Sequence, residues 1–195
     1  MRACGYGGAV ILVVAATEFE AALVDSESAA TVVCGIGPVE AALSTVDAIV
    51  ELRPDAILQI GIAGAQTLAT GSIVLGSESV YCDVLDPQAR IPRVERVAPD
   101  PGLLAIARRA LPEAGVMPIG TTGRVGGGAA CEIEAMEGFG VLRAAARAGV
   151  PAVELRSISN AVADKDRGQW RIEEALAALR TAVVVLIEEV NRAHA

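Results

Sequence analysis

The strongest chemical signal in this sequence is a set of polar residues directly after an apolar stretch. Residues 153–158 have the aliphatic character of a buried strand, and Ser159, Asn160 and Asp164 follow it. Polar residues at the end of a strand in an α/β sheet fall where the sheet opens into a ligand crevice. An amide there can both donate and accept hydrogen bonds. The Ser-Asn pair would equally suit a plain turn into the next helix.

Two glutamates follow another apolar stretch near the start of the chain. Residues 9–15 predict a strand, and Glu18 and Glu20 come just after it. A carboxylate held at a strand end in a partly dry crevice can act as a general base towards water, and Glu20 is the better candidate. Alternatively, both acids only begin the following helix, where the helix dipole favours negative charge.

Two glycine-rich turns could let the backbone approach a ligand closely, and they contain Ile36, Ala63 and Gly64. The first turn, residues 35–40, is not a dinucleotide fingerprint, because Glu40 stands where a third glycine should pack helix on strand. No cofactor is expected.

Apolar periodicity predicts the elements that would position these residues. Residues Pro38–Leu52 have helical spacing, and Pro54 ends that helix before the next strand. Further strands are expected at 30–34, 56–60 and 71–81, and further helices at 101–111, 137–148 and 170–192. Residues 81–96 and 123–133, which include Gly126-Gly127-Gly128, are expected to be loops that wall the site.

Composition and charge exclude several functions. The 195 residues, rich in small aliphatic side chains, fit one domain over residues 1–195. The 24 acidic and 16 basic residues give a net charge of −8, which opposes nucleic-acid binding. No apolar run approaches the roughly 20 residues that span a bilayer, so neither a nucleic-acid nor a membrane partner is expected.

The cysteines, Cys4, Cys34, Cys82 and Cys131, are widely spaced, and His194 is the only histidine. This spacing predicts neither a disulfide framework nor a metal site. It fits a reducing, cytoplasmic compartment.

Taken in order, several short motifs resemble the purine nucleoside phosphorylase and nucleosidase superfamily over nearly the whole chain. They are Ala16-Thr17-Glu18-Phe19-Glu20, Cys34-Gly35-Ile36-Gly37, Gly61-Ile62-Ala63-Gly64, Gly71-Ser72-Ile73-Val74, Met136-Glu137 and Arg156-Ser157-Ile158-Ser159-Asn160. The resemblance implies an α/β fold: a single-domain three-layer α/β/α structure with a mixed, partly barrel-like central sheet. It also implies a small-molecule purine nucleoside as ligand, and a homodimer or higher homo-oligomer.

Within the superfamily, the chain is more similar to the hydrolases than to the phosphorylases. The phosphorylases hold phosphate with arginines in an N-terminal loop and beside the strand-end glycines. Residues 15–17 and 61–65 contain no arginine, so the bidentate donors that suit a phosphate dianion are absent there. Water is the expected nucleophile.

The resemblance also implies roles for individual residues. Glu20 would deprotonate the attacking water, Glu137 would accept hydrogen bonds from ribose hydroxyls, and Asn160 would donate to purine N7. Further substrate-binding candidates are Ile36, Ala63, Gly64, Met136, Arg156, Ser159 and Trp170. Met136 would pack on the sugar and Trp170 near the 5′ substituent, although Trp170 could instead be a core residue at a helix start.

Asn160 bears on the choice of base, because adenine-cleaving members have aspartic acid at that position. An amide suits a 6-oxopurine such as hypoxanthine and loses its match to adenine. The sequence departs from the nucleosidase pattern at Ala135, and its 123–134 segment is shorter. An adenine nucleosidase, a nucleoside-binding member with little turnover, and an acidic interaction module are the alternatives.

Overall fold

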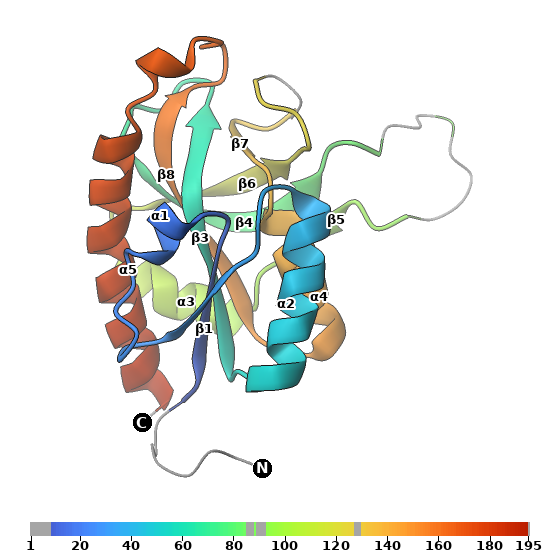
Figure 1. Ribbon diagram of the computed structural model, residues 1–195, viewed down its shortest axis with the longest axis vertical. Coiled ribbons are helices and arrows are strands. Elements are labelled where there is room, and N and C mark those ends of the chain that lie inside the picture. Colours follow the sequence, from blue (N-terminus) through green and yellow to red (C-terminus); the bar gives the residue numbers. More distant parts are fainter. Residues whose placement is uncertain (1–8, 85–87, 89–92, 127–129, 195) are drawn as a thin grey trace.

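The computed structural model describes residues 9–84, 88, 93–126 and 130–194. In this part of the chain, eight strands form one mixed sheet (Figure 1). The strands are β1 (Ile11–Ala15), β2 (Ala30–Val33), β3 (Ala56–Ala65), β4 (Ile73–Tyr81), β5 (Arg96–Val97), β6 (Gly115–Thr121), β7 (Ile133–Ala135) and β8 (Ala152–Ala161).

Five of these strands close into a barrel. β3 pairs with β8 and β7, β4 pairs with β8 and β6, and β6 pairs with β7. The β3–β7 and β4–β8 pairs are antiparallel and the other three are parallel. β1 and β2 extend the parallel part from β3, and β5 adds to β4. The carboxyl ends of β1, β3 and β8 therefore lie side by side, which is where an α/β sheet binds ligands.

The helices have local signals that explain their ends. They are α1 (Glu18–Ala21), α2 (Pro38–Leu52), α3 (Pro101–Ala110), α4 (Gly138–Ala148) and α5 (Ile172–His194), with one 3₁₀ turn, η1 (Arg167–Gln169). α2 begins with a proline, whose missing N–H costs nothing in a first turn, and ends at Arg53 in a left-handed conformation before Pro54. None of these helices is long and apolar enough to cross a membrane, as far as the described residues go.

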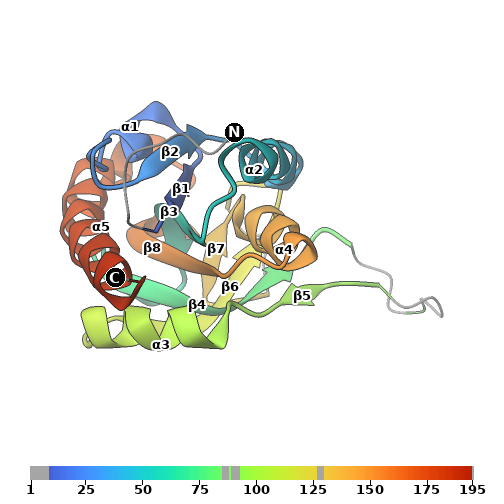
Figure 2. The same cartoon turned by 90° about the horizontal axis from the view of Figure 1, so that it is seen from below.

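The helices cover both sides of the sheet and make three layers. Figure 2 shows α3 and α5 along one side and α2 and α4 along the other. Alternate residues of β1 face opposite layers: Val13 belongs to the same buried cluster as Leu179 of α5, whereas Leu12 belongs to the cluster that contains Val141 of α4. This burial on both faces explains why β1 is an unbroken apolar run.

Most of the predicted elements are confirmed, with β3 and β8 continuing past the predicted ends at residues 60 and 158. The main element that the sequence pattern misses is β6. Its residues include Pro118 and two glycines, which hide the alternation of a strand, and it is held by pairing to β4 on one side and β7 on the other. Gly127 and Gly128 lie outside the described residues.

Cys34, Cys82 and Cys131 are free thiols, and Cys4 lies outside the described residues. Burial, with a smaller effect of the Glu137 carboxylate, raises the pKa of Cys34 to about 12. Its thiol therefore stays protonated and serves as a small apolar packing group.

Candidate active site

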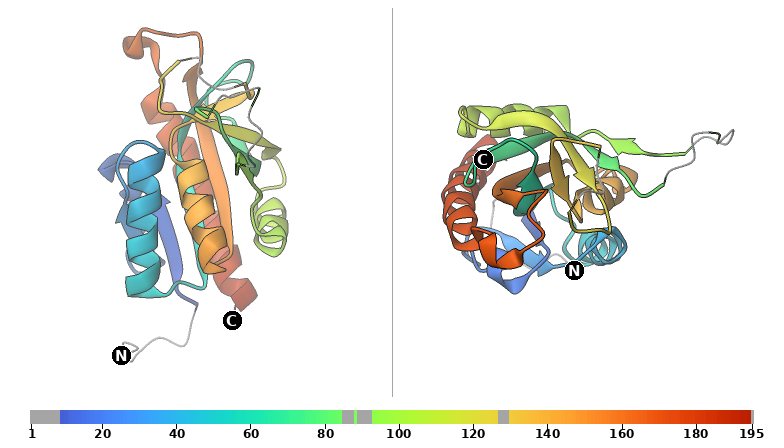
Figure 3. Two further views of the ribbon diagram at one scale, coloured as in Figure 1. Left: turned by 90° about the vertical axis from the view of Figure 1, so that its right-hand side faces the viewer. Right: turned by 90° about the horizontal axis from the view of Figure 1, so that it is seen from above.

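The main cavity lies at the carboxyl ends of β1, β3 and β8 and has a volume of about 410 Å³. In Figure 3 this end of the barrel is seen from above, with the segment around η1 on one side and the segment leading into β7 on the other. Nine of the residues that the sequence singled out line it together: Glu20, Ile36, Ala63, Gly64, Met136, Glu137, Ser159, Asn160 and Trp170.

Glu20 is a buried carboxylate that belongs both to the cavity and to the start of α1. Its Oε2 accepts hydrogen bonds from the backbone N and the hydroxyl of Thr17, at 3.0 and 2.9 Å. Its Oε1 accepts the backbone N–H of Ile62 at 3.0 Å. Glu20 therefore lies both at the start of α1 and in the cavity wall, a position that is compatible with either sequence interpretation. Three hydrogen-bond donors hold the position of this carboxylate in the cavity wall.

Glu137 is held from behind by an arginine that does not reach the cavity. Arg156 is 1% exposed, and its Nη2 donates to Glu137 Oε2 at 3.2 Å while its Nε donates to Glu154 Oε1 at 3.0 Å. Glu137 Oε1 also accepts the backbone N–H of Gly37 at 3.2 Å. Burial lowers the pKa of Arg156, but the neighbouring carboxylates outweigh burial and raise it overall, so the guanidinium stays charged.

Arg156 was predicted to contact the substrate, but it lies behind Glu137 and does not line the cavity. Arg156 also donates to the backbone oxygen of Ile62 at 3.3 Å. A guanidinium therefore lies beside the glycines at the end of β3, although residues 61–65 themselves contain no arginine. Gly61 makes room for it: a Cβ at that position would lie 2.3 Å from Arg156 Nη1 and 2.8 Å from Glu20 Oε1. Because two carboxylates already pair with this guanidinium, it is not available to hold a phosphate.

A β-bulge aims Asn160 at the cavity. Ala63 pairs with Ile158, but the next β3 residue, Gly64, pairs with Asn160, so Ser159 is the extra residue. Without the bulge, Asn160 would face the same side as Ile158, inside the barrel. The bulge turns the amide to the opposite face.

The surrounding groups fix the orientation of the Asn160 amide. The Ser159 hydroxyl lies 2.8 Å from Asn160 Oδ1 and 3.2 Å from the backbone oxygen of Ala63. Asn160 Nδ2 donates to the backbone oxygen of Ala161 at 2.9 Å. The carbonyl end of the amide is thereby turned to the serine, and one N–H of the NH₂ group remains for a ligand.

The outer end of the cavity is apolar and aromatic with a basic rim. Trp170 lines it with Phe19, Ile172 and Leu176, and its indole N–H donates to the backbone oxygen of Asp164 at 3.1 Å. Arg167 lies over the Trp170 ring, 5.6 Å from its centroid. The carboxylate of Asp164, a crevice candidate in the sequence, does not line the cavity.

The structure adds cavity residues that sequence reasoning missed. These are Glu134 of β7 and Val162, whereas residues 124–126, which also line the cavity, belong to the 123–133 loop that was expected to wall the site. The second loop expected to wall the site, residues 81–96, contributes none of its described residues. Glu134 could have been found only by knowing that β7 pairs with β3, because its own three-residue strand carries no clear pattern.

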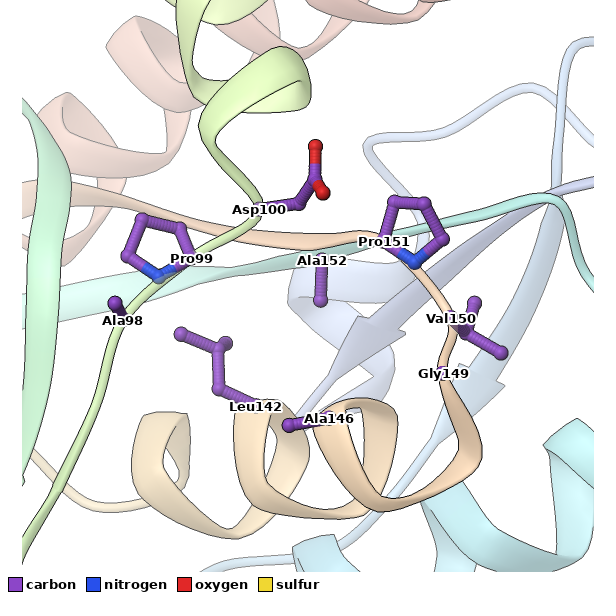
Figure 4. A pocket seen from close by; sticks show the side chains of 9 residues that line it. All are labelled: Ala98, Pro99, Asp100, Leu142, Ala146, Gly149, Val150, Pro151 and Ala152. Carbon is purple, nitrogen blue, oxygen red and sulfur yellow. The ribbon is translucent and has the colours of Figure 1, made fainter.

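A second cavity, of about 270 Å³, lies at the opposite end of β8 (Figure 4). Pro99, Leu142, Val150 and other apolar residues surround it. Its one carboxylate, Asp100, caps α3 by accepting the Leu103 N–H at 2.8 Å. This hollow therefore offers packing and capping groups rather than a catalytic set.

Comparisons with known proteins agree with this geometry. The model of the phosphorylase superfamily matches residues 12–193. Futalosine hydrolase of Streptomyces coelicolor is 37% identical over 176 residues, which cover 76% of this chain and 74% of that protein. The structure of S-adenosylhomocysteine nucleosidase from Streptococcus pyogenes, in complex with 5-methylthiotubericidin, superposes with a TM-score of 0.81 at 21% identity, covering 96% of this chain and 98% of that one. Native futalosine hydrolase of Helicobacter pylori gives a TM-score of 0.82 at 17% identity, covering 93% and 98%.

Proposed function

Since this chain belongs to the phosphorylase superfamily and, within it, to the purine nucleoside N-glycosidases, we propose that it hydrolyses futalosine, an intermediate of menaquinone biosynthesis. The products are hypoxanthine and dehypoxanthine futalosine. The observation that carries the proposal is the amide of Asn160, held by Ser159 so that its NH₂ group is presented to a base. Three buried carboxylates line the same cavity, Glu20, Glu134 and Glu137, and the first and last of them have parts in this proposal.

Water is activated by Glu20 in this proposal. A carboxylate has about four lone-pair sites, and three hydrogen bonds from Thr17 and Ile62 leave room for one water. Those bonds fix the carboxylate next to the place where the sugar binds. As the N-glycosidic bond breaks, Glu20 takes the proton of the water that attacks the anomeric carbon.

Glu137 binds the ribose and stabilises the charge that develops on it in this proposal. Bond breaking builds positive charge on the ribose ring, which a nearby carboxylate stabilises. Arg156 and the Gly37 N–H hold the two Glu137 oxygens, and their remaining lone pairs accept the ribose hydroxyls. Met136, the preceding residue in the cavity wall, packs on the sugar.

Asn160 binds the leaving base, on which negative charge develops as the bond breaks. Its NH₂ group donates towards N7, and in a 6-oxopurine the neighbouring O6 is also an acceptor. In adenine the group beside N7 is an amine, which would meet the NH₂ of Asn160 donor to donor. The amide therefore favours hypoxanthine as the leaving base.

Two features support the rest of the substrate assignment. Arg156 is occupied by carboxylates, and the basic residues among the described cavity lining, Arg124 and Arg167, are exposed at the rim, which supports water rather than phosphate as nucleophile. Trp170 offers a flat apolar surface for the aromatic 5′ arm of futalosine.

Base release from futalosine, inosine and methylthioadenosine, each with and without phosphate, tests the proposal. We expect hypoxanthine release from futalosine to be fastest and independent of phosphate. Faster adenine release from methylthioadenosine would indicate an adenine nucleosidase instead. Release that requires phosphate would indicate a phosphorylase.

A further inference from the structure

One buried carboxylate close to the site lies outside the cavity and has no part in the chemistry described above. Glu154 of β8 is fully buried. Its Oε1 accepts the Nε–H of Arg156 at 3.0 Å, and its Oε2 accepts the hydroxyl of Ser79 from β4. A buried ion pair is often no more stable than apolar residues of the same volume, so stability alone does not explain this charge.

The backbone around Glu154 leaves room for its carboxylate. A Cβ at Gly138, the first residue of α4, would lie 2.2 Å from both Glu154 oxygens. A Cβ at Gly76 of β4 would lie 3.3 Å from Glu154 Cβ. The carboxylate therefore lies beside the first turn of α4, where the helix dipole favours an anion. Two glycines and a helix end accommodate a charge that a smaller apolar side chain would not need.

Arg156 links Glu154 to Glu137, which binds the ribose in the proposed mechanism. Its Nη2 donates to Glu137 Oε2 at 3.2 Å, while its Nε is bonded to Glu154. Burial lowers the pKa of Arg156, but among the carboxylates that raise it Glu154 contributes most, ahead of Glu137 and Glu20. One buried positive charge therefore lies among three buried carboxylates.

The guanidinium of Arg156 has two opposite effects on the proposed reaction. It orients Glu137, but its positive charge opposes the positive charge that develops on the ribose ring as the N-glycosidic bond breaks. In a buried cluster, such a charge acts over several ångströms. A second carboxylate on Arg156, away from the cavity, offsets the guanidinium charge and leaves the negative charge of Glu137 effective at the sugar.

We propose that Glu154 is a positioning residue that holds Arg156 in place and offsets its positive charge, so that Glu137 can stabilise a cationic ribose in the transition state. The inference rests on the proposed function for the cleavage of an N-glycosidic bond. Glu154 does not line the cavity, so it acts on turnover without touching the substrate. An interaction that strengthens only in the transition state changes kcat rather than KM.

Glu154→Gln tests the inference, because the amide keeps the shape of the side chain and removes its charge. We expect kcat for futalosine to fall about tenfold while KM changes little. The measurement is hypoxanthine release under steady-state conditions. Exposed Glu51→Gln is the matched control for the loss of one negative charge.

Two uncleavable ligands measure the same effect without turnover. In both, N9 of hypoxanthine is joined through a methylene group to a hydroxylated five-membered ring, which is a protonated pyrrolidine in one and a neutral cyclopentane in the other. Isothermal titration should show that Glu154→Gln weakens the cationic ligand about tenfold and the neutral ligand much less. Equal losses for the two ligands would overturn the inference and leave Glu154 as a structural support.

Arg156→Gln should change the affinity ratio in the opposite direction. With a neutral amide in place of the guanidinium, repulsion of the charged ring is removed, so the ratio of cationic to neutral ligand affinity should rise about tenfold. If the two residues only support their neighbours, neither variant should raise the ratio. An unchanged or lower ratio in Arg156→Gln would also overturn the inference, and this result can be read even when Glu154→Gln does not fold.

These outcomes separate the inference from the proposed function. If futalosine is cleaved but Glu154→Gln weakens both ligands equally, the inference fails and the proposed function stands. If futalosine is not cleaved but the preference for the cationic ring depends on Glu154, the proposed substrate is wrong and the inference stands. If neither ligand binds to the wild type, both fail.

Discussion

At the residue scale, Glu20 shows how one carboxylate can serve structure and chemistry together. Thr17 and Glu20 form a reciprocal capping box at the start of α1. The other oxygen of Glu20 binds the Ile62 N–H of β3, so the carboxylate ties α1 to the barrel. This double attachment holds the carboxylate still where it meets the cavity.

Glu20→Gln should lower kcat for futalosine by about 10² or more, because an amide cannot take the proton of water. A modest loss of stability, about 1–3 kcal/mol, should accompany it, since one amide oxygen cannot satisfy both Thr17 and Ile62. Steady-state kinetics and thermal unfolding measure the two effects. Exposed Glu18→Gln is the control on the same helix. A folded Glu20→Gln variant with nearly normal turnover would leave Glu20 with the capping role alone.

Glu137→Ala should weaken both affinity and turnover, because a carboxylate that accepts ribose hydroxyls helps in the ground state and the transition state. The measurement is kcat and KM for futalosine and for its 2′-deoxy analogue. We expect the variant to lose most of the wild-type preference for the ribose substrate. Glu51→Ala, at the exposed end of α2, controls for loss of charge. An unchanged preference would show that Glu137 does not contact the 2′-hydroxyl.

Asn160→Asp should narrow the preference for futalosine over its 6-amino analogue. A protonated acid can still donate to N7, while its other oxygen suits an amino group at position 6. One mismatched hydrogen bond in a dry pocket costs about 1–3 kcal/mol, so a change of roughly tenfold to a hundredfold in the ratio of kcat/KM values is expected. A wild type that already prefers the amino substrate would argue against futalosine as the substrate.

At the element scale, β3 positions the site through its backbone rather than through its side chains. Its backbone supplies the Ile62 N–H to Glu20 and the Ile62 oxygen to Arg156. Gly61 and Gly64 leave its surface bare where buried charged groups and the base must approach. The backbone of β3 therefore forms one wall of the site and fixes the positions of Glu20 and Arg156.

Gly61→Ala tests this use of β3. The added Cβ would meet Arg156 Nη1 at 2.3 Å, and Arg156 cannot retreat without breaking its pairs with Glu137 and Glu154. Overpacking of this kind costs about 1–3 kcal/mol, and displacement of Glu20 and Glu137 should remove most activity. Thermal unfolding and hypoxanthine release check both. Gly102→Ala, in the exposed first turn of α3, should keep activity, because its added Cβ would meet only the side chain of Asp100, at 3.2 Å from Oδ1 and outside the cavity. Retained activity in Gly61→Ala would show that the cluster can shift without harm.

At the scale of the whole molecule, α2 exposes an apolar stripe that begins near the cavity. Val39, Leu43, Val46 and Val50 recur at helical spacing and are 48–72% exposed. Ile36 and Phe19, both exposed, continue the apolar surface to the cavity wall. A second copy of the chain is the occupant that we propose for this surface, in line with the homodimer or larger assembly expected from the resemblance.

Leu43→Glu should therefore shift the protein from a dimer or larger assembly towards a monomer in light scattering, because a charge would be buried at the contact. Futalosine turnover should fall with it if the neighbouring copy completes the outer end of the cavity. Val184→Glu, an exposed valine of α5, is the matched control. A wild type that is monomeric at all concentrations would refute this assembly.

The sequence by itself determined most of the elements and nine of the residues that line the cavity. Pro38 and Pro54 bound α2, the apolar runs give β1, β3 and β8, and Glu20 and Asn160 follow from their places after predicted strands, whereas Glu137 was expected from the family resemblance. These features are local, because helix ends, turn residues and alternation depend on near neighbours. The same local reasoning predicted α2 from its apolar spacing, but the stripe that carries this spacing faces outward, and Ala41, Thr45 and Ala48 form the buried face.

Only the tertiary structure decided which groups meet. The family resemblance made Arg156 a substrate-binding candidate, but closure of the barrel buries it between Glu137 and Glu154. The bulge at Ser159 and the pairing of β7 with β3 bring Asn160 and Glu134 to the same face. These are pairings between segments distant in the chain, and no local pattern encodes the register of a strand with a partner far away. The sequence shows which residues have suitable chemistry, whereas the pairing of distant strands decides which of them lie together.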